Sequence, residues 1–187
     1  MKKLIKSPSV SILVVLIVLT VSSIFIHSLM SPSTSSKESE AVGGVVEEVV
    51  ETVAPNNVTF KDFVKKNIRK IAHFAEFGAL GVEACALAIV LLHKKGKRGD
   101  KLSQSTYINA AAVTIIFALL VAFLDESLQL ISKRGPLIED VWLDLLGFSS
   151  FSLISLSSSL VVFAAVKLIK SRKTRRAFKT SGNPPKN

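Results

Sequence analysis

The sequence predicts an all-α fold: an integral membrane helical bundle with four transmembrane helices. Hydrophobic residues make up 49% of the 187 residues. They are gathered in four long runs, each long enough to cross the hydrocarbon core of a bilayer. Short basic segments flank these runs, as is typical of the ends of membrane helices. The polar residues that do occur within the runs are concentrated near their ends.

The first run is the predicted N-terminal transmembrane helix, which we assign to residues 1–30. Lys2, Lys3 and Lys6 precede an apolar span that extends from about Ser9 to Met30. This span is longer than the apolar region of a usual secretory signal peptide, and no small-residue cleavage motif follows it. We therefore expect an uncleaved first span.

Residues 31–66 are predicted to form an extracytoplasmic loop rich in Ser and Glu. The loop begins with the stretch 31–39, whose Ser and Pro residues favour irregular structure. Between Val45 and Val53, valines and glutamates would occupy opposite faces of a helix. This segment is either a short surface helix or a solvated linker. Valine is a weak helix former, and acidic side chains do not favour an anionic lipid surface.

Residues 67–170 are predicted to form a three-helix membrane core, and residues 171–187 a basic cytoplasmic tail. The expected spans of the core are Ile71–Leu92, Tyr107–Leu124 and Val141 to about Ile169. A tight loop with Gly135-Pro136 as its turn joins the last two spans. The stretch Lys167–Asn187, which includes this tail, is rich in Lys and Arg, and we expect it to be disordered.

The distribution of positive charge predicts how the helices are oriented. The formal net charge is +10, but the basic residues lack the interleaved aromatics of a nucleic-acid-binding surface. With the N-terminus inside, 16 of the 24 Lys and Arg residues lie on the cytoplasmic side, as the positive-inside rule favours. We therefore expect a multi-pass cell-membrane protein with both termini in the cytoplasm and no nucleic-acid partner. The basic segment Lys61–Lys70 is the exception, because it falls on the outer side.

This orientation places polar residues of three spans, and of the loop between two of them, at the outer face of the membrane. In chain order they are Arg69, His73, Glu76, Asp125, Glu126, Gln129, Arg134, Asp140 and Asp144. Most of those on one span are three or four residues apart, so each helix carries one polar stripe that a bundle would turn inward. Gly147 follows Asp144 by three residues and would let a neighbouring helix approach closely.

His73 and the four carboxylates of Glu76, Asp125, Glu126 and Asp144 are the candidate catalytic groups. They could bind a divalent ion, or the carboxylates could hold the imidazole for acid/base work. No Gly-rich phosphate loop, HExxH motif or serine-nucleophile motif occurs. The sequence therefore identifies neither a cofactor nor a reaction.

The remaining outer-face residues are expected to act in binding: Arg69, Gln129, Arg134 and Asp140. Arg134 is also the expected internal counter-ion of the acids. The structural alternative is helix-end electrostatics, which accounts for Asp140 as a cap of the fourth span. It does not account for Asp144, which lies inside that helix.

Three further residues, Glu83, Trp142 and Cys85, lie within or beside the spans but outside the polar group at the outer face. Glu83 lies about 15 Å deeper than His73, at 1.5 Å per residue. It is either a neutral acid bonded to a hydroxyl of a neighbouring span, such as the serines of the fourth, or the titrating group of a proton or ion path. Trp142 is expected to anchor its helix at the membrane interface. Cys85 is expected to be a small buried hydrophobic residue without a disulfide.

Three segments of the sequence resemble motifs of the VanZ-like family of membrane proteins. The first is RKIAHFAEFGALG (Arg69–Gly81). The second is DESLQL followed by Arg134, and the third is EDVWLDLLG (Glu139–Gly147). The nine outer-face residues carry the family pattern. Two departures are Ile131, where an aromatic residue is usual, and the short loop before Arg134.

This resemblance implies a helical integral membrane protein of the bacterial envelope. The family's namesake is associated with low-level resistance to teicoplanin, a lipoglycopeptide. We therefore expect a site at the outer leaflet that binds or acts on an envelope component, such as a lipid-linked or lipidated molecule. The alternatives are a membrane-embedded hydrolase or transferase that uses the same residues, and a proton- or ion-coupled transporter that uses Glu83.

Overall fold

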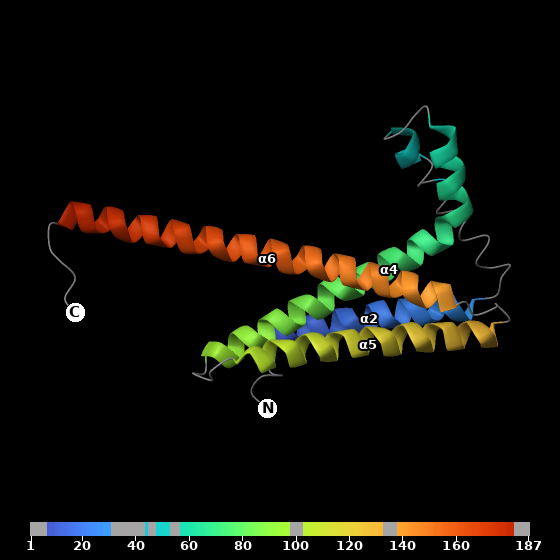
Figure 1. Cartoon of the computed structure of the whole chain (residues 1–187), viewed down its shortest axis with the longest axis horizontal. Coiled ribbons are helices and arrows are strands. Elements are labelled where there is room, and N and C mark those ends of the chain that lie inside the picture. The colour runs from blue at the N-terminus through green and yellow to red at the C-terminus, as the bar shows by residue number, and fades with distance from the viewer. Residues whose placement is uncertain are drawn as a thin grey trace.

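The computed structural model describes residues 7–30, 44, 48–52, 57–97, 103–132 and 138–181. Within these ranges the chain forms no strand, and its four long helices are α2 (Pro8–Leu29), α4 (Val58–Lys97), α5 (Gln104–Ile131) and α6 (Ile138–Ser181) (Figure 1). All four are long and apolar enough to cross a membrane. The predicted all-α bundle with four membrane helices is therefore confirmed.

Some predictions fall on residues outside the described ranges. They concern most of the segment 31–56, the Gly135-Pro136 turn, Arg134 and the end of the tail after Ser181.

Most apolar side chains of the helices face outward rather than into the bundle. On α2, Ile12, Val15 and Leu19 are each more than half exposed, whereas Ile24 is fully buried. Apolar exposure on this scale is unfavourable in water and suits contact with lipid tails. The buried core is correspondingly thin and consists mainly of Ile24, Phe77, Leu80, Ala84, Ala118, Val121, Ala122 and Phe148.

Three helices are longer than the expected spans: α5, which covers Gln104–Ile131 where Tyr107–Leu124 was expected, and α4 and α6. α4 begins at Val58, before the expected start at Ile71, and the Asn57 side chain accepts a hydrogen bond from the Phe60 backbone N–H at 3.0 Å. This is the geometry of an N-cap. α6 continues to Ser181, so the expectation of disorder was wrong for residues 167–181. Lys and Arg are good helix formers, and no proline occurs between Ile138 and residue 184.

The most extensive contact between helices is the crossing of α4 and α6. Gly147 of α6 lies so close to α4 that an added Cβ would be 2.4 Å from the Phe74 backbone oxygen. An added Cβ at Gly81 of α4 would be 2.3 Å from the Phe148 backbone oxygen. The close approach predicted at Gly147 is confirmed. Small residues serve this purpose in membrane helices because they let two backbones touch.

The direction of the helices brings their polar ends together. The C-terminal ends of α2 and α5 lie beside the N-terminal end of α6 (Figure 1, right). α4 passes the same region, and its N-terminal part then bends away from the other helices. Of the polar residues predicted at the outer face, those within the described ranges lie at this end of the bundle.

Candidate functional site

Three side chains from three helices meet at this end of the bundle. His73 of α4 has its Nδ1 atom 3.6 Å from Oδ2 of Asp125 on α5 and 3.9 Å from Oδ1 of Asp144 on α6. The exposed fractions are 12% for His73, 0% for Asp125 and 1% for Asp144. The sequence predicted that these residues would share one level of the membrane. The structure brings them into a single cluster, which we call the His-Asp-Asp cluster.

Asp125 is held in place by hydrogen bonds to both of its oxygens. The Ser28 hydroxyl at the end of α2 donates to Oδ1. The Gln129 amide, one turn later on α5, donates to Oδ2 at 3.1 Å and to Oε1 of Glu126 at 2.9 Å. Arg69 of α4 donates to the Gln129 carbonyl oxygen at 3.2 Å and so orients that amide. Arg69 therefore acts on the cluster through Gln129.

Asp144 differs from Asp125 in its hydrogen bonding. Neither of its carboxylate oxygens has a hydrogen-bond partner among the described residues, although the side chain is almost fully buried. A buried carboxylate without a hydrogen-bond partner costs several kcal/mol unless it is protonated or binds a cation. Its Oδ1 atom faces His73. Ligand atoms of His73, Asp125 and Asp144 all lie within 4.8 Å of one another, so among the described residues these three could hold a metal ion.

Glu76 belongs to a second polar group rather than to the cluster. Its Oε1 atom lies 2.6 Å from His27 Nδ1 and accepts a hydrogen bond from the Ser23 hydroxyl at 3.4 Å. Both partners are on α2, a helix that the sequence analysis treated only as a membrane span. A usable signal was present, because Thr20, Ser23 and His27 are three and four residues apart and so form a polar stripe.

Asp140 and Lys70 form an ion pair at the edge of the site, with 3.1 Å between Oδ1 and Nζ. Asp140 is 18% exposed. It is the third residue of α6 rather than its N-cap, because the helix already begins at Ile138. Its charge still favours the helix through its place in the first turn. The expected counter-ion Arg134 lies outside the described residues, and Arg69 is a cation that does reach the site.

Glu83 is separate from the His-Asp-Asp cluster. It accepts a hydrogen bond on Oε1 from the Thr20 hydroxyl of α2 at 3.0 Å, and its Oε2 atom has no hydrogen-bond partner in the described part of the chain. A hydroxyl partner was expected from the fourth span, and the structure supplies one from the first. Trp142 is 64% exposed, as a residue facing lipid would be. Cys85 is partly buried.

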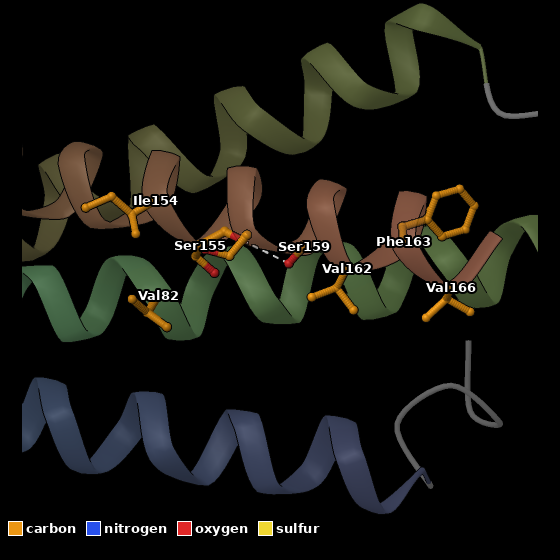
Figure 2. A pocket seen from close by; sticks show the side chains of 8 residues that line it. Val82, Ile154, Ser155, Ser159, Val162, Phe163 and Val166 are labelled. Carbon is orange, nitrogen blue, oxygen red and sulfur yellow. Dashed lines mark hydrogen bonds between the residues drawn. The ribbon is translucent and has the colours of Figure 1, made fainter. Parts of the chain in front are cut away.

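A shallow apolar groove of about 650 Å³ lies between α4 and α6, beyond their crossing. Figure 2 shows Val82 of α4 on one side and a row of α6 side chains that includes Ile154, Val162 and Phe163 on the other. The Ser159 hydroxyl donates within its own helix to the Ser155 backbone oxygen at 2.9 Å. No residue of the His-Asp-Asp cluster lines this groove, so the chemistry of the site lies elsewhere.

The chain is similar to a known protein family. The model of the family described as VanZ/LLP1 matches residues 12–167, which include all four membrane helices in whole or in large part. The chain matches no curated protein and no solved structure.

Proposed function

Because the chain belongs to the VanZ/LLP1 family, we propose that it binds a lipid-linked or lipidated molecule of the bacterial envelope at the polar end of its helical bundle. The binding groups would be the His-Asp-Asp cluster together with Arg69 and Gln129. The site would face the outer leaflet of the cell membrane, with both termini in the cytoplasm, as the distribution of Lys and Arg favours.

The observation that supports this proposal is the depth of the cluster. Asp125 is six residues from the end of α5, and Asp144 is six residues from the start of α6. At 1.5 Å per residue, both carboxylates lie about 9 Å inside the helix ends. If the ends of α5 and α6 lie at the aqueous surface, this depth is close to the boundary between lipid headgroups and acyl chains. A lipidated molecule would then have its polar part at this level and its chain beside the exposed apolar faces of the helices.

The charges at this level do not follow the pattern that helix stability alone would favour. Helix-end electrostatics requires only acids at N-termini and bases at C-termini. Asp125 lies six residues before the end of α5, where this effect gives a negative charge no benefit, and it is buried completely. Membrane proteins retain such buried charges mainly where they serve a function.

The test is binding of teicoplanin to the full-length protein in lipid nanodiscs. The matched ligand is teicoplanin from which the acyl chain has been removed. We expect the acylated ligand to bind at least tenfold more tightly, because burial of each CH₂ group contributes about 0.8 kcal/mol. His73→Ala should weaken binding at least tenfold, whereas His93→Ala should not, because His93 is exposed on the same helix and distant in sequence from the cluster.

Equal binding of the two ligands would argue against recognition of a lipidated molecule. Equal binding by His73→Ala and wild type would remove the cluster from the proposal. A role in teicoplanin resistance, as in the family's namesake, is the corresponding proposal for the living cell. In cells, expression of the wild type or of His93→Ala should raise the minimal inhibitory concentration of teicoplanin, whereas expression of His73→Ala should not.

Catalysis at the same cluster is the second candidate. The specific observation in its favour is that Nδ1 of His73 faces two buried carboxylates, of which Asp125 is fixed by Ser28 and Gln129. An imidazole beside such carboxylates can transfer a proton. An enzyme would convert its ligand over time, and mass spectrometry of the bound lipid fraction would detect the product. A binding protein would return the ligand unchanged.

A further inference from the structure

The three side chains of the His-Asp-Asp cluster are spaced like the ligands of a metal ion. A divalent ion about 2.1 Å from each of three ligands in a tetrahedral arrangement places the ligand atoms about 3.4 Å apart. His73 Nδ1 lies 3.6 Å from Asp125 Oδ2 and 3.9 Å from Asp144 Oδ1. The two distances from His73 exceed this value by 0.2 and 0.5 Å, and ligand atoms of all three residues lie within 4.8 Å of one another. Side-chain rotation can bring atoms this close together around a bound ion.

Charge also favours a cation at this point. Asp125 and Asp144 bring two carboxylates into a region where both side chains are almost fully buried. Asp144 has no hydrogen-bond donor for either oxygen within the described ranges, and its Oδ1 atom points toward His73. We propose that His73, Asp125 and Asp144 form a binding site for a divalent transition-metal ion of the Zn²⁺ type. This inference does not depend on the proposed function.

The surroundings of Asp125 match those of a metal ligand. Ligating carboxylates are usually oriented by hydrogen bonds from neighbouring side chains. Ser28 donates to Oδ1 and Gln129 donates to Oδ2, while Arg69 orients Gln129. The carboxylate is thus fixed before any ion binds. An Oδ2 atom that accepts one hydrogen bond at 3.1 Å retains a second lone pair for an ion.

The donor set determines the class of ion. One imidazole nitrogen and two carboxylate oxygens suit Zn²⁺, Mn²⁺ or Fe²⁺, whereas Mg²⁺ and Ca²⁺ prefer oxygen ligands alone. Three protein ligands leave one coordination position of a tetrahedral ion open. Sites of this type accept water or a substrate oxygen there, whereas structural zinc sites are closed by a fourth side chain. The cluster therefore resembles an open site.

The test is metal binding by the purified full-length protein, stripped with a chelator and prepared without a polyhistidine tag. ZnCl₂ is titrated in by isothermal calorimetry, and bound zinc is counted by mass spectrometry after dialysis. We expect one Zn²⁺ per chain for the wild type and no comparable binding of MgCl₂. His73→Ala and Asp144→Asn should each weaken Zn²⁺ binding at least 100-fold. The matched controls are His93→Ala and Asp62→Asn, two exposed positions on α4, and both should bind as the wild type does.

Two further measurements keep the result interpretable. Zn²⁺ should raise the melting temperature of the wild type and leave that of Asp144→Asn unchanged, while the metal-free forms of both should melt cooperatively. Ser28→Ala should weaken Zn²⁺ binding about 10–100-fold through the orientation of Asp125. The proposal is overturned if the wild type binds no Zn²⁺, or if His73→Ala and Asp144→Asn bind it as tightly as the wild type. No lipidated ligand is present in this experiment, so its outcome is separate from that of the teicoplanin test.

Discussion

The crossing of α4 and α6 leads to a prediction with a graded series of variants. Replacing Gly81 with alanine would place a Cβ atom 2.3 Å from the Phe148 backbone oxygen. An ordinary contact of this kind begins at 3.4 Å, so the two helices would have to separate by 1.1 Å. Both groups in the clash belong to helical backbones, and no side chain can rotate to relieve it. The helices themselves must move.

Two opposing effects set the size of the change. Alanine favours a helix over glycine by about 1 kcal/mol. Against this, overpacking of a close contact costs about 1–3 kcal/mol. The separation also stretches the hydrogen bond from the Ser152 hydroxyl to the Gly81 backbone oxygen, now 3.0 Å, beyond bonding range. That loss adds about 1 kcal/mol. The clash prevails, and we expect Gly81→Ala to lower the free energy of unfolding by about 1–3 kcal/mol.

The assay is thermal unfolding of the purified protein in detergent. For a chain of this length, 1 kcal/mol corresponds to about 2–4 °C in melting temperature. Gly81→Ala and Gly147→Ala should therefore each lower the melting temperature by several degrees. Gly78→Ala should have a smaller effect, because its nearest contact is the Phe151 ring, which is a side chain. Gly44→Ala is the control, because nothing lies within 4 Å of an added Cβ there.

A melting temperature for Gly81→Ala equal to or above that of the wild type would refute this reasoning. It would mean that helix propensity outweighs the contact, or that the helices do not touch at this point. Gly147→Ala has a second expected effect. Its clash is with Phe74, the neighbour of His73, so it should also weaken Zn²⁺ binding.

Three other predictions follow from the hydrogen bonds and the topology. Ser28→Ala removes a buried hydrogen bond to Asp125 and should lower the free energy of unfolding, measured by denaturation, by about 1–3 kcal/mol. The control Ser22→Ala loses only an exposed hydrogen bond to its own helix and should change that free energy by less than about 0.5 kcal/mol. Glu83→Gln keeps an oxygen that can accept from Thr20, so ligand and Zn²⁺ binding should persist; loss of ion-driven uptake in vesicles with this variant would instead favour the transporter hypothesis. In a Cys85→Ala background, Ser132→Cys should react with a membrane-impermeant thiol reagent in intact cells. Labelling of Ser171→Cys instead would show that the helices have the opposite orientation, with the C-terminus outside.

The convergence of His73, Asp125 and Asp144 could be predicted because charged residues near the ends of apolar runs are rare and costly. Once helices of alternating direction are assumed, the positions of these three residues along the chain determine the membrane level at which they meet. The partners of each residue could not be predicted in the same way. Helical spacing gives the face on which Glu76 lies, but only packing decides that this face meets α2 at that depth. Glu76 consequently pairs with His27 rather than joining the cluster.

The lengths of α4 and α6 were underestimated for a different reason. The expected spans ended where hydrophobic residues gave way to basic ones. That change marks the edge of the membrane, but it does not end a helix, because Lys and Arg favour helical structure. The contribution of α2 was missed because hydroxyl groups in an apolar run are common and can bond to their own backbone, as Ser22 does.

The hydrogen bond between Ser28 and Asp125 has a consequence for how the protein is made. The two residues are 97 positions apart in the chain. At a synthesis rate of about 5–20 residues per second, α2 leaves the ribosome roughly 5–20 seconds before its partner. α2 can first pack against α4 through the His27–Glu76 and Thr20–Glu83 contacts, and the bond to Asp125 forms once α5 arrives. A cell that makes α2 and the remainder as two separate polypeptides should still assemble the site, provided both fragments meet within the same bilayer.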